Sequence, residues 1–136
     1  MCKYSSMEWI VIISINTLLL LSGCEEDQTK QLKVTATAFN SVPSQTDINH
    51  PLITAWGDKL QPGMKCIAVS RDLIQMGLTH GTEVTIEGLP GTYKVLDKMN
   101  KRWEKKIDIY MGNNVEAAKQ WGVKQVIISW NPKSDK

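Results

Sequence analysis

The strongest constraint on the fold is a series of short segments in which apolar, often β-branched, residues alternate with polar ones or run together. Such segments are typical of β-strands. Turn residues separate six of them: 33–39, 65–69, 82–86, 92–96, 107–110 and 124–130. Two or three short helices are expected between them. Two of these are 71–76 and 115–120, because Ser70 and Asn113 or Asn114 can serve as N-caps. This pattern predicts a mainly β chain that forms a small barrel or sandwich.

Two of these strands carry an aspartate each. Asp97 ends one apolar run, Asp108 lies inside the next, and a basic segment separates them. If the two strands converge, the carboxyl groups come close together. A carboxyl group that apolar neighbours desolvate has a raised pKa and can act as an acid near neutral pH. The alternative is that both aspartates are turn or ion-pair residues, because Lys98, Arg102 and Lys106 are near in sequence.

Residues 1–23 have the features of a lipoprotein signal peptide. An almost unbroken apolar run from Trp9 to Leu21 is too short for a comfortable membrane span, which needs about 20 residues. The run ends in Leu-Ser-Gly-Cys, which resembles the lipobox of bacterial lipoproteins, where the chain is cut before the cysteine and the cysteine then carries lipid. We expect acyl chains on Cys24 to hold the protein on a membrane surface. The alternative is an ordinary signal peptide or an uncleaved anchor.

The residue after Cys24 is Glu25, which is not the inner-membrane Asp signal of Gram-negative lipoproteins. The resemblance therefore favours the outer membrane, facing the periplasm, in a Gram-negative cell. We expect the lipidated Cys24 and a polar tether to extend to residue 32, one domain to occupy 33–131, and a polar tail to follow at 132–136. The formal net charge of +2 is too small for a nucleic-acid-binding protein.

The remaining cysteine and the histidines give no sign of a cofactor. After removal of Cys2 and lipidation of Cys24, Cys66 stands alone, so the mature form has no intramolecular disulfide. Its apolar neighbours predict a buried structural thiol rather than a nucleophile. His50 and His80 lie in separate loops with no second ligand at metal-binding spacing. No metal ion or other cofactor is expected.

Taken together, a set of short motifs from Val34 to Trp130 resembles the bacterial 3D domain, named for three aspartates, and its relatives among the MltA-type lytic transglycosylases. The matching residues are Thr35–Phe39, Thr54–Gly57, Ile67–Val69, Gly81–Thr82, Val84, Asp97, Ile107–Tyr110, Ala117, Trp121–Gly122 and Val126. Asp97 and Asp108 are eleven positions apart, as the family pattern expects. Ser70 stands where the family often has an aspartate, and the nearest carboxylate is Asp72.

The resemblance implies a double-psi β-barrel with a glycan groove. Characterised enzymes of the family cleave the β-1,4 bond between N-acetylmuramic acid and N-acetylglucosamine in peptidoglycan and form a 1,6-anhydro sugar. By position, Asp108 would be the acid and base, with Asp97 close by. Thr37 and Thr54 would bind the sugar or orient the aspartates, and Lys98 would contact the glycan or a peptide carboxylate.

Two loop tryptophans and the small size of the domain leave alternatives open. Trp56 and Trp103 can stack on sugar rings or pack over the barrel ends. MltA-type enzymes have a second domain that forms the other wall of the groove, and this chain has no room for one. Peptidoglycan glycan strands are the expected ligand, and an envelope protein would complete the groove. The alternative function is a non-catalytic module that binds glycan or an envelope partner, and a weaker one is a purely structural lipoprotein.

Overall fold

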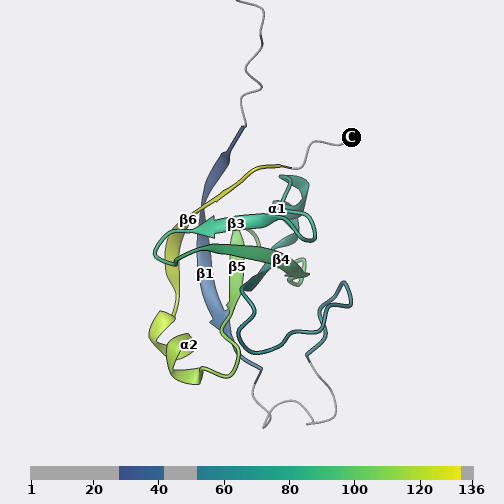
Figure 1. Ribbon diagram of the computed structural model, residues 1–136. Coiled ribbons are helices and arrows are strands. Elements are labelled where there is room, and N and C mark those ends of the chain that lie inside the picture. Colours follow the sequence, from purple (N-terminus) through teal and green to yellow (C-terminus); the bar gives the residue numbers. More distant parts are fainter. Residues whose placement is uncertain (1–27, 42–51, 133–136) are drawn as a thin grey trace, which may run out of the picture.

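The computed structural model describes residues 28–41 and 52–132, in which six β-strands close into a barrel with two short helices (Figure 1). The elements are β1 (Lys30–Phe39), β2 (Cys66–Val69), α1 (Arg71–Gln75), β3 (Glu83–Ile86), β4 (Thr92–Lys98), β5 (Lys106–Tyr110), α2 (Val115–Trp121) and β6 (Lys124–Trp130). The prediction of a mainly β chain that forms a small barrel with short helices is confirmed. The expected lipidation site, Cys24, and His50 lie outside the described residues.

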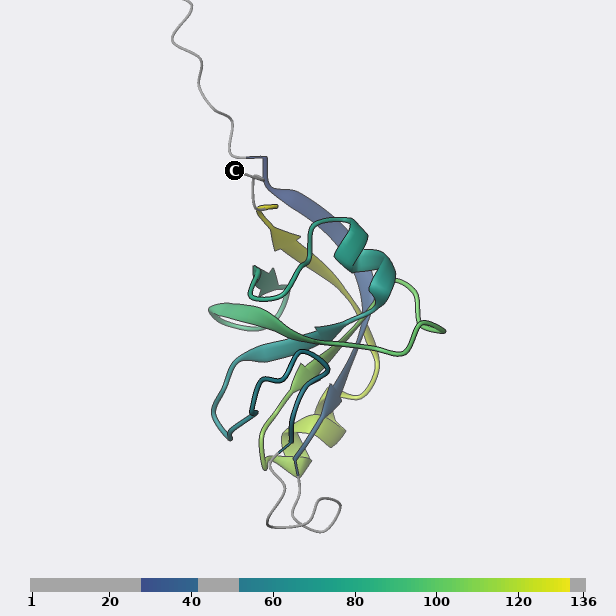
Figure 2. The same ribbon diagram turned by 90° about the vertical axis from the view of Figure 1, so that its right-hand side faces the viewer.

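The strand order around the barrel is β1-β5-β2-β4-β3-β6, and β6 pairs with β1 to close it. The pairs β1–β5 and β2–β4 are parallel, and the other four are antiparallel. β2 therefore lies between β4 and β5, the two strands that carry Asp97 and Asp108. The helices lie toward opposite ends of the barrel in both views (Figures 1 and 2).

Two strands are longer than their sequence pattern predicts, because pairing continues beyond the alternating residues. β1 begins at Lys30, where it already pairs with Trp130 of β6. β4 continues to Lys98, which pairs with Val69 of β2. Asn114 caps α2 as expected, since its side chain accepts a hydrogen bond from the Ala117 N–H.

The barrel interior is filled by aliphatic side chains from every strand, by Leu73 and Leu78 from α1 and the turn after it, and by Trp121 and Trp130. Full burial of one such aliphatic side chain contributes about 1.5–3 kcal/mol. Neither helix in the described ranges is long and apolar enough to cross a membrane.

A second, smaller apolar cluster lies apart from this interior. Leu60, Cys66 and Tyr110 form its buried centre. The segment 52–64 supplies Leu60 and two further members of this cluster, so it lies against β2 and β5. Cys66 is buried there as predicted, and burial, with smaller contributions from the charges of Asp97 and Asp58, raises the pKa of its thiol to about 11.

Candidate functional site

Four strands place one residue each in a single line across the sheet. Thr37 of β1 pairs with Asp108 of β5, Asp108 pairs with Ala68 of β2, and Ala68 pairs with Asp97 of β4. Paired residues of neighbouring strands project from the same face of a sheet. We call these four residues the acid row. The fold thus brings together the two aspartates that the sequence singled out, with only the small Ala68 between them.

Asp108 points away from the barrel interior because its neighbours point into it. Ile107 and Ile109 are both buried in the core. Side chains alternate along a strand, so Asp108 between them lies on the outer face.

Asp97 reaches the same face by a different route, through a β-bulge. The register between β2 and β4 shifts after Ile67, so that Ile67 pairs with Val95 while Ala68 pairs with Asp97. Leu96 is the extra residue. In a regular ladder Asp97 would share the face of Val95, which is fully buried. The bulge turns the carboxylate outward, as bulges beside functional sites commonly do.

The surroundings of Asp108 favour its protonated form. Burial is the largest influence and raises the pKa of this carboxyl, and the nearby charge of Asp97 raises it further. A hydrogen bond of 3.0 Å from the Thr37 hydroxyl to Oδ1 and the positive charge of Lys106 act in the opposite direction but do not cancel the rise. Asp108 therefore keeps its proton to a higher pH than an ordinary aspartate does.

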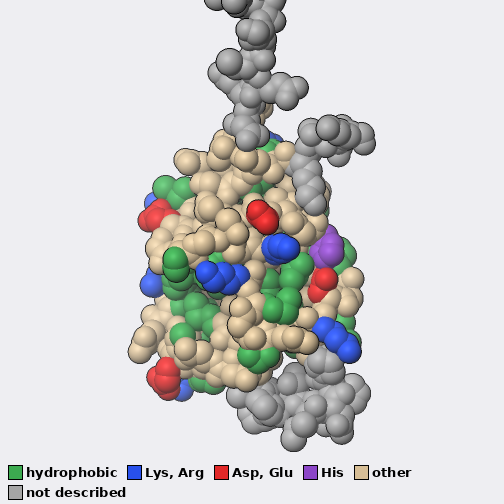
Figure 3. All heavy atoms as spheres, viewed as in Figure 1, with side chains coloured by type: hydrophobic (Ala, Val, Ile, Leu, Met, Phe, Trp, Pro, Cys, Tyr) green, Lys and Arg blue, Asp and Glu red, His purple; other side chains and the backbone are tan. Residues whose placement is uncertain are grey.

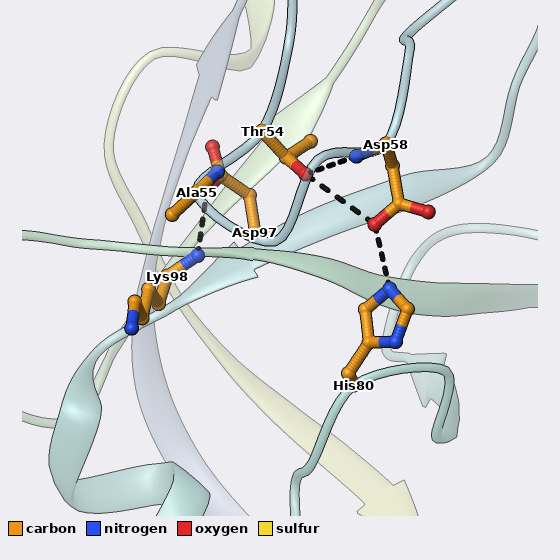
Figure 4. A network of polar contacts seen from close by, with 6 residues as sticks. All are labelled: Thr54, Ala55, Asp58, His80, Asp97 and Lys98. Carbon is orange, nitrogen blue, oxygen red and sulfur yellow. Dashed lines mark hydrogen bonds and ion pairs between the residues drawn. The ribbon is translucent and has the colours of Figure 1, made fainter.

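Asp97 is held by the backbone. Its Oδ1 accepts hydrogen bonds from the N–H groups of Ala55 and Lys98, each at 2.9 Å. Ala55 belongs to a turn that is closed by the isolated bridge between Ile53 and Lys59. Asp97 therefore fastens this turn to the barrel (Figure 4).

Thr54 begins the same turn, and its hydroxyl bonds within it rather than to either aspartate. It accepts a hydrogen bond of 3.0 Å from the Asp58 N–H and donates to Asp58 Oδ2 at 3.3 Å. The same Oδ2 lies 2.6 Å from His80 Nε2, so Asp58 stands between Thr54 and His80 (Figure 4). Thr54 is itself buried.

Sequence reasoning missed the pair of Asp58 and His80. The Thr54–Asp58 spacing is a local turn signal of the kind in which a hydroxyl bonds to the backbone a few residues on. His80 lies 22 positions from Asp58, and no local pattern joins them.

Trp56 and Trp103, the two tryptophans expected either to stack on sugar rings or to pack over the barrel ends, each lie beside cationic side chains. Trp56 is half-buried against the core, and its ring forms an edge-to-face pair with the His80 ring. Lys98 Nζ lies 5.7 Å from the centroid of the Trp56 ring. Trp103 is 37 % exposed, and Lys106 Nζ lies 3.7 Å from its ring centroid. Trp56 is therefore in contact with Lys98, another of the residues predicted to bind substrate.

Ser70 and Asp72 hold the loop that precedes β5. Ser70 is fully buried, and its hydroxyl accepts a hydrogen bond from the Lys106 N–H at 3.0 Å. Asp72 Oδ2 accepts from the Lys105 N–H at 2.9 Å. Partial burial acts to raise the pKa of Asp72, but hydrogen bonds from the Ser70 hydroxyl and from backbone N–H groups, Lys105 included, lower it overall. The displaced carboxylate of the sequence pattern is thus a structural anchor.

A pocket of about 550 Å³ lies elsewhere, over β3, β4 and β6, and contains no member of the acid row. Its lining includes the exposed residues Glu83, Lys94 and Thr92. We favour the acid row as the functional site because it places two carboxyl groups on neighbouring positions and the pKa of one of them, Asp108, is raised. This is the pattern of acid–base sites. On the face shown in Figure 3, basic side chains lie among acidic and apolar ones.

The acid row holds a carboxyl group suited to proton transfer, since the pKa of Asp108 is raised. Among residues 28–41 and 52–132, no three His, Cys, Asp or Glu side chains are grouped to hold a metal ion.

Comparison with family models and with curated proteins finds no match for this chain.

Proposed function

We propose that this protein is a lipid-anchored cell-envelope protein, related to 3D-domain proteins, that cleaves peptidoglycan as a lytic transglycosylase. The observation that carries the proposal is the acid row, in which Asp108, with its raised pKa, and Asp97 lie on either side of Ala68. An acid that stays protonated and a second carboxylate beside it are what the reaction needs.

In the proposed reaction one carboxyl group acts twice. Protonated Asp108 gives its proton to the glycosidic oxygen, and the bond from C1 of the muramic acid to that oxygen breaks. The Asp108 carboxylate then takes the proton from the C6 hydroxyl of the same sugar, whose oxygen bonds to C1 and closes the 1,6-anhydro ring. No water is consumed. This differs from glycosidases that divide the work between two carboxyl groups.

The other members of the acid row have supporting roles. The Thr37 hydroxyl holds Asp108 Oδ1 in place, which leaves Oδ2 to carry the proton. The charge of Asp97 stabilises the positive charge that develops on the sugar ring in the transition state. Ala68 is buried and separates the two carboxyl groups by the width of one strand.

The test uses residues 25–136 without the lipid, incubated with purified peptidoglycan sacculi, with mass spectrometry of the released muropeptides. We expect 1,6-anhydro products from the wild type and a loss of about 10²–10⁴-fold for Asp108→Asn, the range that general acid–base catalysis contributes. Glu83→Gln is the matched control, since it removes a carboxylate from the 550 Å³ pocket and leaves the acid row intact. Equal product from Asp108→Asn and wild type would refute the assignment.

Anchoring through Cys24 is tested separately. We expect cells that express the full chain to incorporate labelled palmitate into it, and expect Cys24→Ser to abolish both the label and the membrane fraction. Fractionation of a Gram-negative host should place the wild type in the outer membrane.

A non-catalytic glycan-binding protein is the second candidate. It is favoured by the position of the acid row on the outer face of the barrel, where the segment 52–64 lies beside Asp97. Binding of sacculi without products, by a wild-type protein tested alongside an active transglycosylase, would support this candidate. If addition of envelope proteins restored the products, a partner that forms the second wall of the groove would be indicated.

A further inference from the structure

Positive charge is concentrated in the segment that joins β4 and β5, the strands that carry Asp97 and Asp108. Residues 98–106, here called the basic loop, contain five Lys or Arg and one Glu, a net charge of +4. The whole chain has a net charge of +2, so the rest of it carries +2 − 4 = −2. The cationic residues are Lys98, Lys101, Arg102, Lys105 and Lys106.

Side chains at the start of α1 fix the backbone of this loop. Besides the bonds from Ser70 and Asp72 described above, Arg71 Nε donates to the Met99 carbonyl oxygen at 3.2 Å. Lys105 has a φ of 44°, a left-handed conformation that is unusual for a residue other than glycine. A loop held in this way loses less conformational entropy when it binds a ligand.

Trp103 is in contact with two of these cationic side chains, Arg102 and Lys106, at the surface. Lys106 Nζ lies 3.7 Å from its ring centroid and Arg102 Cζ lies 4.9 Å from it. Both contacts are within the range of cation–π attraction. Lys106 also lies two positions before Asp108 on the same face of β5, and its charge acts on that carboxyl. The clustered cations are therefore neighbours of the proposed acid.

We infer that the basic loop, with Trp103 as its platform, binds carboxylates of the peptides that branch from the glycan strand. The inference rests on the proposed function, because it assumes that a glycan strand lies along the acid row. Lys and Arg form strong, charge-assisted hydrogen bonds with carboxylates, and the planar guanidinium of Arg102 can bind one in a bidentate manner. The loop selects glycan strands that carry peptides over strands that have lost them.

The experiment measures binding by the mature lipoprotein in detergent, with Asp108→Asn present throughout so that no strand is cut. The probes are soluble glycan strands with intact peptides and the same strands after their carboxylates have been converted to methylamides. The test variant is Arg102→Gln with Lys106→Gln. The control variant, Lys65→Gln with Lys94→Gln, removes the same charge at the other end of β2 and β4, where Lys65 lies over the Tyr93 ring.

We expect the reference protein to bind intact strands at least about tenfold more tightly than amidated ones, the scale of one charge-assisted contact. The test variant should lose this preference, and the control should keep it. Equal binding of both probes by the reference protein would overturn the inference. An equal loss of affinity for intact strands in the control variant would also overturn it, since the binding would then depend on the net positive charge of the protein rather than on the basic loop.

Vesicles that contain anionic phospholipid address the rival assignment of the basic loop to a membrane. If the test variant lost vesicle binding and retained its preference for intact strands, the inference would be overturned in favour of a membrane contact. Product analysis with unmodified Asp108 separates the two proposals. Absence of anhydro products with the strand preference intact refutes the enzyme alone, and products without any strand preference refute the role of the loop alone.

Discussion

Asp108 and Asp97 lie in one line across the sheet, yet the molecule holds them in different ways. Asp108 is on a regular strand, receives a hydroxyl hydrogen bond and is desolvated, so that its pKa is raised. Asp97 is on a bulged strand and accepts hydrogen bonds from two backbone N–H groups. One of these donors, Ala55, is 42 positions away in the chain. The difference assigns separate roles to the two carboxyl groups. Asp108 holds no backbone segment within the described residues and is suited to exchange a proton, whereas Asp97 fixes the turn that contains Ala55.

The largest effect expected from this difference is on turnover. Asp108→Asn should lower the rate of anhydro-product formation by about 10²–10⁴-fold. It should leave the far-ultraviolet circular dichroism spectrum unchanged, because the hydrogen bond that this carboxyl accepts within residues 28–41 and 52–132 comes from a side chain, Thr37. Kinetics and circular dichroism spectra measured on one preparation test the predicted loss of rate and the predicted retention of secondary structure. A variant that unfolded would contradict the idea that Asp108 has no structural duty.

Asp97→Ala should affect both activity and stability. The Ala55 and Lys98 N–H groups lose their acceptor, and hydrogen bonds to a charged group contribute about 1.5–3 kcal/mol each at most. We expect the free energy of unfolding in urea to fall by about 1–3 kcal/mol, and turnover to fall by about 10²-fold as the neighbouring turn shifts. Unchanged stability would remove the distinction between the two aspartates.

Thr37→Val tests how the acid is tuned. The Thr37 hydrogen bond lowers the pKa of Asp108, so its loss should raise that pKa and move the alkaline limb of the pH–rate profile to higher pH. We expect the rate at the optimum to fall by only about tenfold, since a single neutral hydrogen bond is lost. Thr35→Val, on the same face of β1, is the matched control. A limb that moved to lower pH would contradict the assignment.

The pH dependence of the free energy of unfolding should reveal the raised pKa of Asp108. Its pKa in the folded state lies above the ordinary value of 3.8, so the unfolded chain releases this proton first as the pH rises. The folded wild type therefore loses stability from about that pH until the folded-state pKa has been passed. Asp108→Asn lacks this loss, and its advantage in urea unfolding should grow with pH over the same interval. The opposite contribution of Asp72, whose lowered pKa adds stability above its ordinary value, cancels in the difference.

The smallest effect is expected at His80. His80→Gln removes an exposed partner of Asp58 and should cost about 0.2–1 kcal/mol, as exposed ion pairs do. Activity should remain within about twofold, since Asp97 still fastens the turn. A loss as large as that of Asp97→Ala would show that both ends of the turn are needed to hold the site.

The sequence was sufficient for a mainly β chain because its strands alternate apolar and polar residues, and the segment from Thr82 to Ile86 shows this clearly. The alternation left a barrel and a sandwich open, and only the family resemblance favoured the barrel. The sequence also identified both aspartates. It could not show the bulge at Leu96, because a bulge depends on how two strands pair and the sequence of β4 alone does not reveal the pairing. Nor could it show that Ser70 and Asp72 hold Lys105 and Lys106, since those contacts depend on the closed barrel.

The parallel pairing of β1 with β5 has a consequence for the order of events in folding. Thr37 and Asp108 are 71 positions apart, and several elements lie between them in the chain. Contacts over such separations form slowly, because a long loop must close before they stabilise anything. A complete chain that is still extended contains both aspartates but no acid row. If the proposed activity holds, a cell that makes this protein is protected from it until almost the entire domain has been assembled.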